Sequence, residues 1–160
     1  MRWTLNILTV LMVLGLAAFI MIQHESGASY KHQQEAARKA TYRLHQEITL
    51  QATLMQKNSS GFHYPDTIDP KWFPSGVPQN PLLTGPHPWI SICSVEDRLL
   101  DHPRNPLAAD SQTAQFWYNP YRGLIRARIP ADLNEADALA LYNFINECAR
   151  PALFATPPRN

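Results

Sequence analysis

The chain has 160 residues, with 14 lysines and arginines against 13 aspartates and glutamates, a formal net charge of +1 at pH 7, and two cysteines. This near-neutral balance excludes the basic surface of a nucleic-acid-binding protein and the acidic composition of a solvating tail. The residues after the apolar start suffice for one domain with a hydrophobic core of its own.

The first predicted element is an apolar helix over residues 3–22, WTLNILTVLMVLGLAAFIMI, which contains no charged side chain. Such a helix is about 30 Å long, which matches the hydrocarbon core of a bilayer. A cleaved secretory signal has a shorter apolar core of about 7–15 residues. We therefore interpret residues 1–28 as a retained transmembrane anchor, and removal of a signal after Ala28 is the alternative.

An N-terminal apolar segment with so little ahead of it typically exports the rest of its chain. The only two cysteines, Cys93 and Cys148, form an even pair. A disulfide between them is predicted to contribute about 4 kcal/mol, with two buried, unpaired thiols as the alternative. The predicted location is the inner (cytoplasmic) membrane, crossed once, with the C-terminal domain in the periplasm or outside the cell. Membrane lipid is therefore among the predicted partners.

Residues 29–57 are predicted to continue as a helical stalk that packs on the domain. Apolar or small residues recur there at alternating steps of three and four, which defines one narrow stripe. The stripe consists of Ala37, Thr41, Leu44, Ile48, Ala52 and Met55. The NSSG segment at 58–61 is predicted to end the helix, with Gly61 in the left-handed position.

Residues 58–160 are predicted to form the globular domain, and its first part, residues 62–88, is a loop rich in proline and aromatic residues. Its seven prolines forbid helix and most sheet pairing. The interleaved aromatic residues are untypical of a disordered linker. If this loop binds a partner, we expect Trp72, Phe73 and Trp89 to make the contact.

A small antiparallel sheet is predicted next, from a strand at 89–95 and a β-hairpin at 115–130 that turns at NPYRG. In the second arm of the hairpin, successive side chains alternate between an apolar face and a face that carries arginines. One face has Ile125, Ala127 and Ile129, and the other has Leu124, Arg126 and Arg128. We interpret the second face as solvated. Binding of an anionic partner by Arg122, Arg126 and Arg128 is the alternative.

The last predicted element is a short helix over residues 132–149. Asp132 and Glu135 resemble a capping box at its start, and Pro151 is expected to end it. Its apolar face consists of Ala138, Leu141, Tyr142, Ile145 and Cys148. The predicted class is therefore α+β, with a long membrane-spanning helix that continues into an exported domain.

The chain carries no motif that indicates catalysis. The histidines lack zinc-binding spacing, no serine lies in a G-x-S-x-G turn, and no phosphate-binding glycine loop occurs. We predict no enzyme, no cofactor, no metal site and no catalytic residue. A hydrolase that uses His102 or Asp66 is a third hypothesis, disfavoured because no nucleophile–base pair is visible.

The opening segment WTLNILTVLMVLGLAAF resembles the N-terminal helix of type IV pilins and type II secretion pseudopilins. Trp3 stands where that family has phenylalanine, and Thr4 and Leu5 match the family motif. The chain departs from the motif at Arg2, in place of glycine, and at Ile7, in place of glutamate. FHYPDTID after the stalk and FWYNPYRGLIRARIP in the hairpin are also similar to pseudopilin domains.

The resemblance implies a non-enzymatic envelope component of a type II secretion or type IV pilus-like assembly. Its partners would be other pilin-like subunits or secretion-machine proteins. In such an assembly, Gly15, Ala17 and Ala18 would allow neighbouring helices to approach closely. The alternative is a membrane-tethered extracytoplasmic binding module, unrelated to pili, that uses the aromatic loop as its contact surface.

Overall fold

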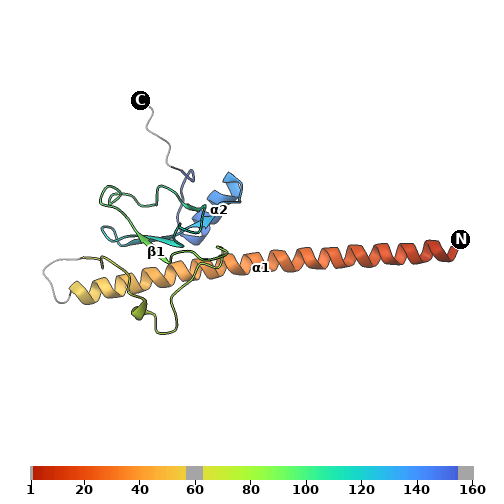
Figure 1. The fold of residues 1–160 in the computed structure, drawn as a ribbon, viewed down its shortest axis with the longest axis horizontal. Coiled ribbons are helices and arrows are strands. Elements are labelled where there is room, and N and C mark those ends of the chain that lie inside the picture. Colours follow the sequence, from red (N-terminus) through yellow and green to blue (C-terminus); the bar gives the residue numbers. More distant parts are fainter. Residues whose placement is uncertain (1, 57–62, 155–160) are drawn as a thin grey trace, which may run out of the picture. The chain divides into compact units, whose positions relative to one another are not determined.

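The computed structural model describes the backbone of residues 2–56 and 63–154, and the side chains of residues 27–55 and 63–154. Its elements are α1 (Arg2–Gln56), a 3-10 turn (Pro70–Trp72), β1 (Ile90–Ile92), β2 (Leu107–Ala108), β3 (Phe116–Asn119), β4 (Leu124–Ala127), β5 (Ile129–Pro130) and α2 (Glu135–Ile145). They confirm the α+β class with a long N-terminal helix and small sheets. The chain divides into two compact units, residues 1–33 and 34–160, and the second contains every described strand and α2 (Figure 1).

Helix α1 contributes one apolar stripe to the core of the second unit. Proline is absent from it, and strong helix formers occupy most of its wet face. The side chains of residues 27–33 are exposed. The buried positions are Ala37, Ala40, Thr41, Leu44, Ile48 and Ala52. The predicted stripe is therefore confirmed except at Met55. This side chain is 45% exposed and lies beyond Ala52, the last buried position of the stripe.

The predicted location is contradicted by the structure. Over the residues that it describes, no helix combines the length and the apolarity needed to cross a bilayer. A single-pass inner-membrane protein is therefore the wrong interpretation, and the membrane-spanning part of the predicted fold class is wrong with it. The side chains of residues 1–26, including those of Gly15, Ala17 and Ala18, lie outside the described residues, as does the NSSG segment at 58–61.

The main sheet has the strand order β1-β3-β4 and is mixed. β3 and β4 form the predicted antiparallel hairpin, with Phe116 opposite Ala127. β1 runs parallel to β3, and β2 and β5 form a second parallel pair. The prediction of an antiparallel sheet is thus wrong for β1. A parallel pair needs a crossover connection, which residues 93–115 supply.

One face of the hairpin packs on the stripe of α1, as the alternation of β4 predicts. The side chains on this face are Phe116 and Tyr118 of β3 and Ile125 and Ala127 of β4, each at most 1% exposed. The hydroxyl of Tyr118 donates a hydrogen bond to the carbonyl of Pro65 at 2.7 Å, which ties the proline-rich segment to the sheet.

The opposite face of the hairpin is partly covered rather than solvated, which corrects the prediction: in the second arm its side chains are half-buried at Leu124, Arg126 and Arg128, and on β3 they are buried. Trp117 is 4% exposed and Asn119 is fully buried. The amide of Asn119 donates hydrogen bonds to the carbonyls of Arg98 and Leu100, at 3.0 and 2.9 Å. The connection between β1 and β3 therefore folds back over this face and satisfies its polar groups.

Helix α2 begins and ends at other residues than predicted. Its N-cap is Asn134, whose side-chain oxygen accepts a hydrogen bond from the backbone N–H of Asp137, so Asp132 lies outside the helix. Its buried positions are Ala138, Leu141, Tyr142 and Ile145, as predicted, whereas Cys148 of the predicted face lies beyond the end of the helix and is half-buried. The helix stops at Ile145, well before Pro151, because the chain turns out of it at Glu147.

Candidate functional site

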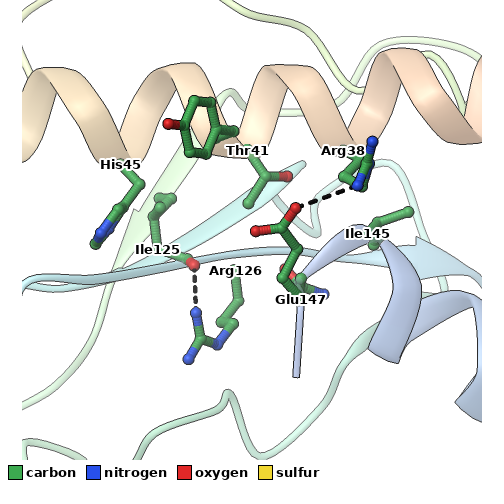
Figure 2. Close-up of a pocket in the computed structure, with 9 residues that line it drawn as sticks. Arg38, Thr41, His45, Ile125, Arg126, Ile145 and Glu147 are labelled. Carbon is green, nitrogen blue, oxygen red and sulfur yellow. Dashed lines mark hydrogen bonds and ion pairs between the residues drawn. The ribbon is translucent and has the colours of Figure 1, made fainter. Parts of the chain in front are cut away.

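A pocket of about 200 Å³ opens in the second unit between α1, β4 and the carboxyl end of α2 (Figure 2). Its lining consists of Arg38, Thr41, Tyr42, His45, Ile125, Arg126, Ile145, Asn146 and Glu147. Ile125 and Ile145 are each 1% exposed and supply an apolar interior. Charged and polar side chains of α1 and of the turn after α2 surround it.

Arg38 lines one end of this pocket. Its guanidinium donates to Glu35 at 3.0 Å and to Glu147 at 3.3 Å, and it lies 5.3 Å from the ring centroid of Phe144. Figure 2 shows the Arg38 side chain reaching from α1 to Glu147. Because all three charged groups are substantially exposed, each pair contributes at most about 1 kcal/mol.

Glu147 occupies a position that normally favours glycine. Its φ is +47°, and it follows the C-cap Asn146 in a Schellman motif. In that motif the N–H of Glu147 donates to the carbonyl of Phe144, and the N–H of Cys148 donates to the carbonyl of Asn143. A left-handed conformation costs a non-glycine residue about 1 kcal/mol, which its contact with Arg38 offsets in part.

Asn146 occupies the outer edge of β4. Its amide oxygen accepts from the N–H of Ala127 at 2.7 Å, and its amide nitrogen donates to the carbonyls of Ala127 and Tyr142, both at 3.0 Å. In the β3–β4 register, the backbone groups of Ala127 point away from β3. The Asn146 side chain therefore takes the place of a further strand at this point.

A second set of polar groups lies beyond the other face of β4, and we refer to it as the arginine–histidine cluster. It consists of His102, Arg126, Tyr142 and Arg150. The Nε of Arg126 donates to the Nδ1 of His102 at 3.3 Å, and the hydroxyl of Tyr142 lies 3.2 Å from the same nitrogen. Since Nδ1 accepts from Arg126, it carries no proton.

This environment disfavours the charged form of His102. Burial and the nearby guanidinium groups of Arg126 and Arg150 lower its pKa to about 4, and Asp101 opposes them only in part. Burial also raises the pKa of Tyr142 and that of the neighbouring thiol of Cys148. At neutral pH the cluster thus holds the positive charges of its two arginines beside the uncharged side chains of His102 and Tyr142.

We expect His102 to make the domain sensitive to acid. Its folded pKa lies below the value of 6.5 for an unperturbed histidine, so the unfolded chain binds the proton more readily as the pH falls from 6.5 to 4. The contribution of His102 to the free energy of unfolding is therefore fully present above pH 6.5 and is lost as the pH falls toward 4. Allowing for the partial exposure of the ring, the loss is about 1–2 kcal/mol.

Urea unfolding at pH 7 and pH 4.5, followed by tryptophan fluorescence, measures this loss. The matched variant is His102→Gln, which keeps a hydrogen-bond acceptor but does not titrate, so it should lose about 1–2 kcal/mol less than the wild type over this pH range. Equal losses in the two proteins would contradict the role of His102.

The aromatic residues predicted to contact a partner mostly pack inward. Phe73 is 4% exposed, and its ring meets that of Trp89 edge to face at 5.8 Å. The indole of Trp89 donates to the carbonyl of Pro78 at 2.8 Å. Phe73 therefore has little surface to offer a partner. Contact through the half-buried Trp72 and Trp89 stays a prediction.

Cys93 and Cys148 are both free thiols in the structure, so the predicted disulfide is not formed. Each thiol lies in its own packed site. The Sγ of Cys148 donates to the amide oxygen of Asn143 at 3.3 Å, whereas Cys93 follows β1, where its backbone N–H donates to the carbonyl of Tyr118. Burial raises the pKa of both thiols, which disfavours the reactive thiolate.

Of the arginines proposed from the sequence as an anion-binding set, only Arg126 belongs to the cluster. Arg122 pairs with Asp101 at 2.9 Å. Arg128 donates to Asn105, Ser91 and Ala114, and burial lowers its pKa. Sequence reasoning missed Arg150, because a residue beyond the last helix carries no periodic signal that links it to β4.

Within the described residues, no three histidine, cysteine, aspartate or glutamate side chains are grouped to hold a metal ion. His102 makes its contacts with Tyr142 and Arg126, and Asp66 is an exposed loop residue, so the hydrolase hypothesis gains no support. Comparison of the chain with protein-family models, with curated proteins and with solved structures finds no match.

Proposed function

We propose that this chain is a non-enzymatic, pilin-like subunit that assembles with further copies of itself or with related subunits through its N-terminal helix. The observation that carries the proposal is the division of α1 between two units. Among the α1 side chains that the structure describes, those in the core of the second unit begin at Ala37, whereas the first unit consists of residues 1–33. The described part of that unit is helix alone.

A single helix has no interior of its own. The sequence of this one includes the uncharged residues 3–22, and apolar side chains on a lone helix need a surface supplied from outside it. A helix of a second subunit offers such a surface. Small residues at Gly15, Ala17 and Ala18 would let two helices approach closely there.

The second unit supports the same proposal. A stripe of one helix packed on a β-hairpin, with a Tyr-Pro segment after the helix and a glycine in the hairpin turn, is the arrangement that the pilin-like resemblance implies. The contacts involved are those of α1 with the hairpin face, of Tyr118 with Pro65, and of Gly123 with Tyr64. None of them requires a substrate or a cofactor.

Sedimentation of the full chain, kept dispersed in a mild detergent, tests the proposal. The wild type is expected to self-associate, and Gly15→Leu and Ala18→Leu are expected to weaken association by about tenfold or more. Ala28→Leu is the matched control, since Ala28 is an exposed position of the same helix. Circular dichroism verifies that the domain of each variant is folded.

Two results would contradict this proposal. One is a wild-type chain that stays monomeric at every concentration. The other is an Ala28→Leu variant that loses association as strongly as the two test variants, since that would indicate non-specific contact of the helix.

A further inference from the structure

The arginine–histidine cluster contains more positive charge than its protein partners balance. Four ion pairs join arginines to carboxylates in the described part of the chain, and neither Arg126 nor Arg150 takes part in any of them. Asp101, the acidic residue that acts on His102, is already paired with Arg122 at 2.9 Å. Glu147, near Arg150 in sequence, is paired with Arg38.

The guanidinium groups of Arg126 and Arg150 both lie close to the rings of His102 and Tyr142. Arg126 donates to His102 at 3.3 Å, the rings of His102 and Tyr142 are 5.7 Å apart, and the guanidinium carbon of Arg150 lies 5.5 Å from the ring centroid of Tyr142. Both arginines lower the pKa of His102. Like charges brought together in a half-buried site raise its energy unless an opposite charge joins them.

The cluster also has an unused donor. The Nη1 atom of Arg150 is buried and finds no hydrogen-bond partner among the described residues. A buried N–H group of a charged side chain rarely lacks an acceptor, because burial removes its hydrogen bond to water and nothing then replaces it. An acceptor that carries negative charge would satisfy this atom and balance the two guanidinium groups together.

We infer that Arg126 and Arg150, flanked by His102 and Tyr142, form a binding site for a small oxyanion, a carboxylate or a phosphate group. Guanidinium groups bind both kinds of anion through paired N–H donors, which a chloride ion cannot exploit in the same way. The site lies beyond the face of β4 that is opposite α1 and shares only Arg126 with the lining of the pocket, and Figure 2 shows the Arg126 side chain directed away from α1. It does not depend on the function proposed above.

Thermal unfolding of the full chain with added anion tests this inference. Sodium phosphate and sodium acetate are titrated separately at constant ionic strength, with sodium chloride as the balance. When the concentration of the anion is about ten times its dissociation constant, the melting temperature of the wild type should be roughly 3–6 °C higher than in chloride. The more effective salt identifies which of the two groups the site prefers.

Three variants locate the effect. Arg126→Lys and Arg150→Gln should each weaken anion affinity by about tenfold. Arg122→Ala, which removes a neighbouring arginine that is already paired with Asp101, should change it by less than about twofold. On the folded wild type, NMR signals of the His102 ring and of the Arg126 and Arg150 side chains should shift together as phosphate or acetate is added.

The inference is overturned if neither salt moves these signals or the melting temperature beyond the effect of chloride. It is also overturned if Arg122→Ala weakens the response as much as Arg126→Lys or Arg150→Gln, because the anion would then be bound by general surface charge. If a cluster variant does not fold, the NMR titration of the wild type decides alone.

Discussion

Replacing Leu44 by alanine is expected to lower the free energy of unfolding by about 3 kcal/mol, one of the two largest effects that we predict. Leu44 is fully buried in the core that α1 forms with the hairpin. The substitution removes apolar contacts and leaves a cavity that the surrounding strands cannot fill without moving. Urea unfolding followed by tryptophan fluorescence measures the change.

Leu50→Ala is the matched control, since Leu50 lies on the same helix and is 50% exposed. Its substitution should change the free energy of unfolding by less than about 0.5–1 kcal/mol. Comparable losses in the two variants would mean that α1 does not pack on the domain through the face described.

The second large effect is expected at Gly123, in the turn between β3 and β4. Its φ is +65°, in the left-handed region, and a Cβ placed there would collide with the ring of Tyr64. Gly123→Ala therefore adds steric overlap to backbone strain. We expect a loss of about 2–4 kcal/mol in the free energy of unfolding, measured in the same urea experiment.

The two contributions can be separated with a second glycine. Gly85 has a φ of +87°, and no atom lies within 4 Å of the Cβ that alanine would add. Gly85→Ala should therefore cost only the backbone term, about 1 kcal/mol. In a Tyr64→Ala background, Gly123→Ala should fall to a similar cost, whereas an unchanged cost would show that the Tyr64 ring does not cause the loss.

Local periodicity explains which parts of this fold could be predicted. Steps of three and four along α1 identified its buried stripe, and strict alternation in β4 identified the face that meets it, because both patterns depend on residues that are neighbours in the chain. The same reasoning failed at the boundaries of α2. Asn134, not Asp132, caps its start, and the helix ends before a left-handed Glu147, a residue type that gives no signal for that conformation.

Features that depend on distant segments were not predictable from pattern. The parallel pairing of β1 with β3 is decided by the path of residues 93–115, and strand composition carries no information on direction. The arginine–histidine cluster joins residues from separate segments. The sequence suggested Arg126 and His102 only in unrelated roles, and their meeting with Arg150 arises from tertiary packing alone.

The mixed sheet also has a consequence for the order in which the second unit acquires and loses structure. The β3–β4 hairpin closes a short loop, whereas β1 must find β3 across an intervening segment of 23 residues, 93–115. Loop closure costs more entropy for longer loops, and β1 contributes only three residues in return. We therefore expect β1 to join β3 after the β3–β4 hairpin has closed, and to detach before the hairpin opens.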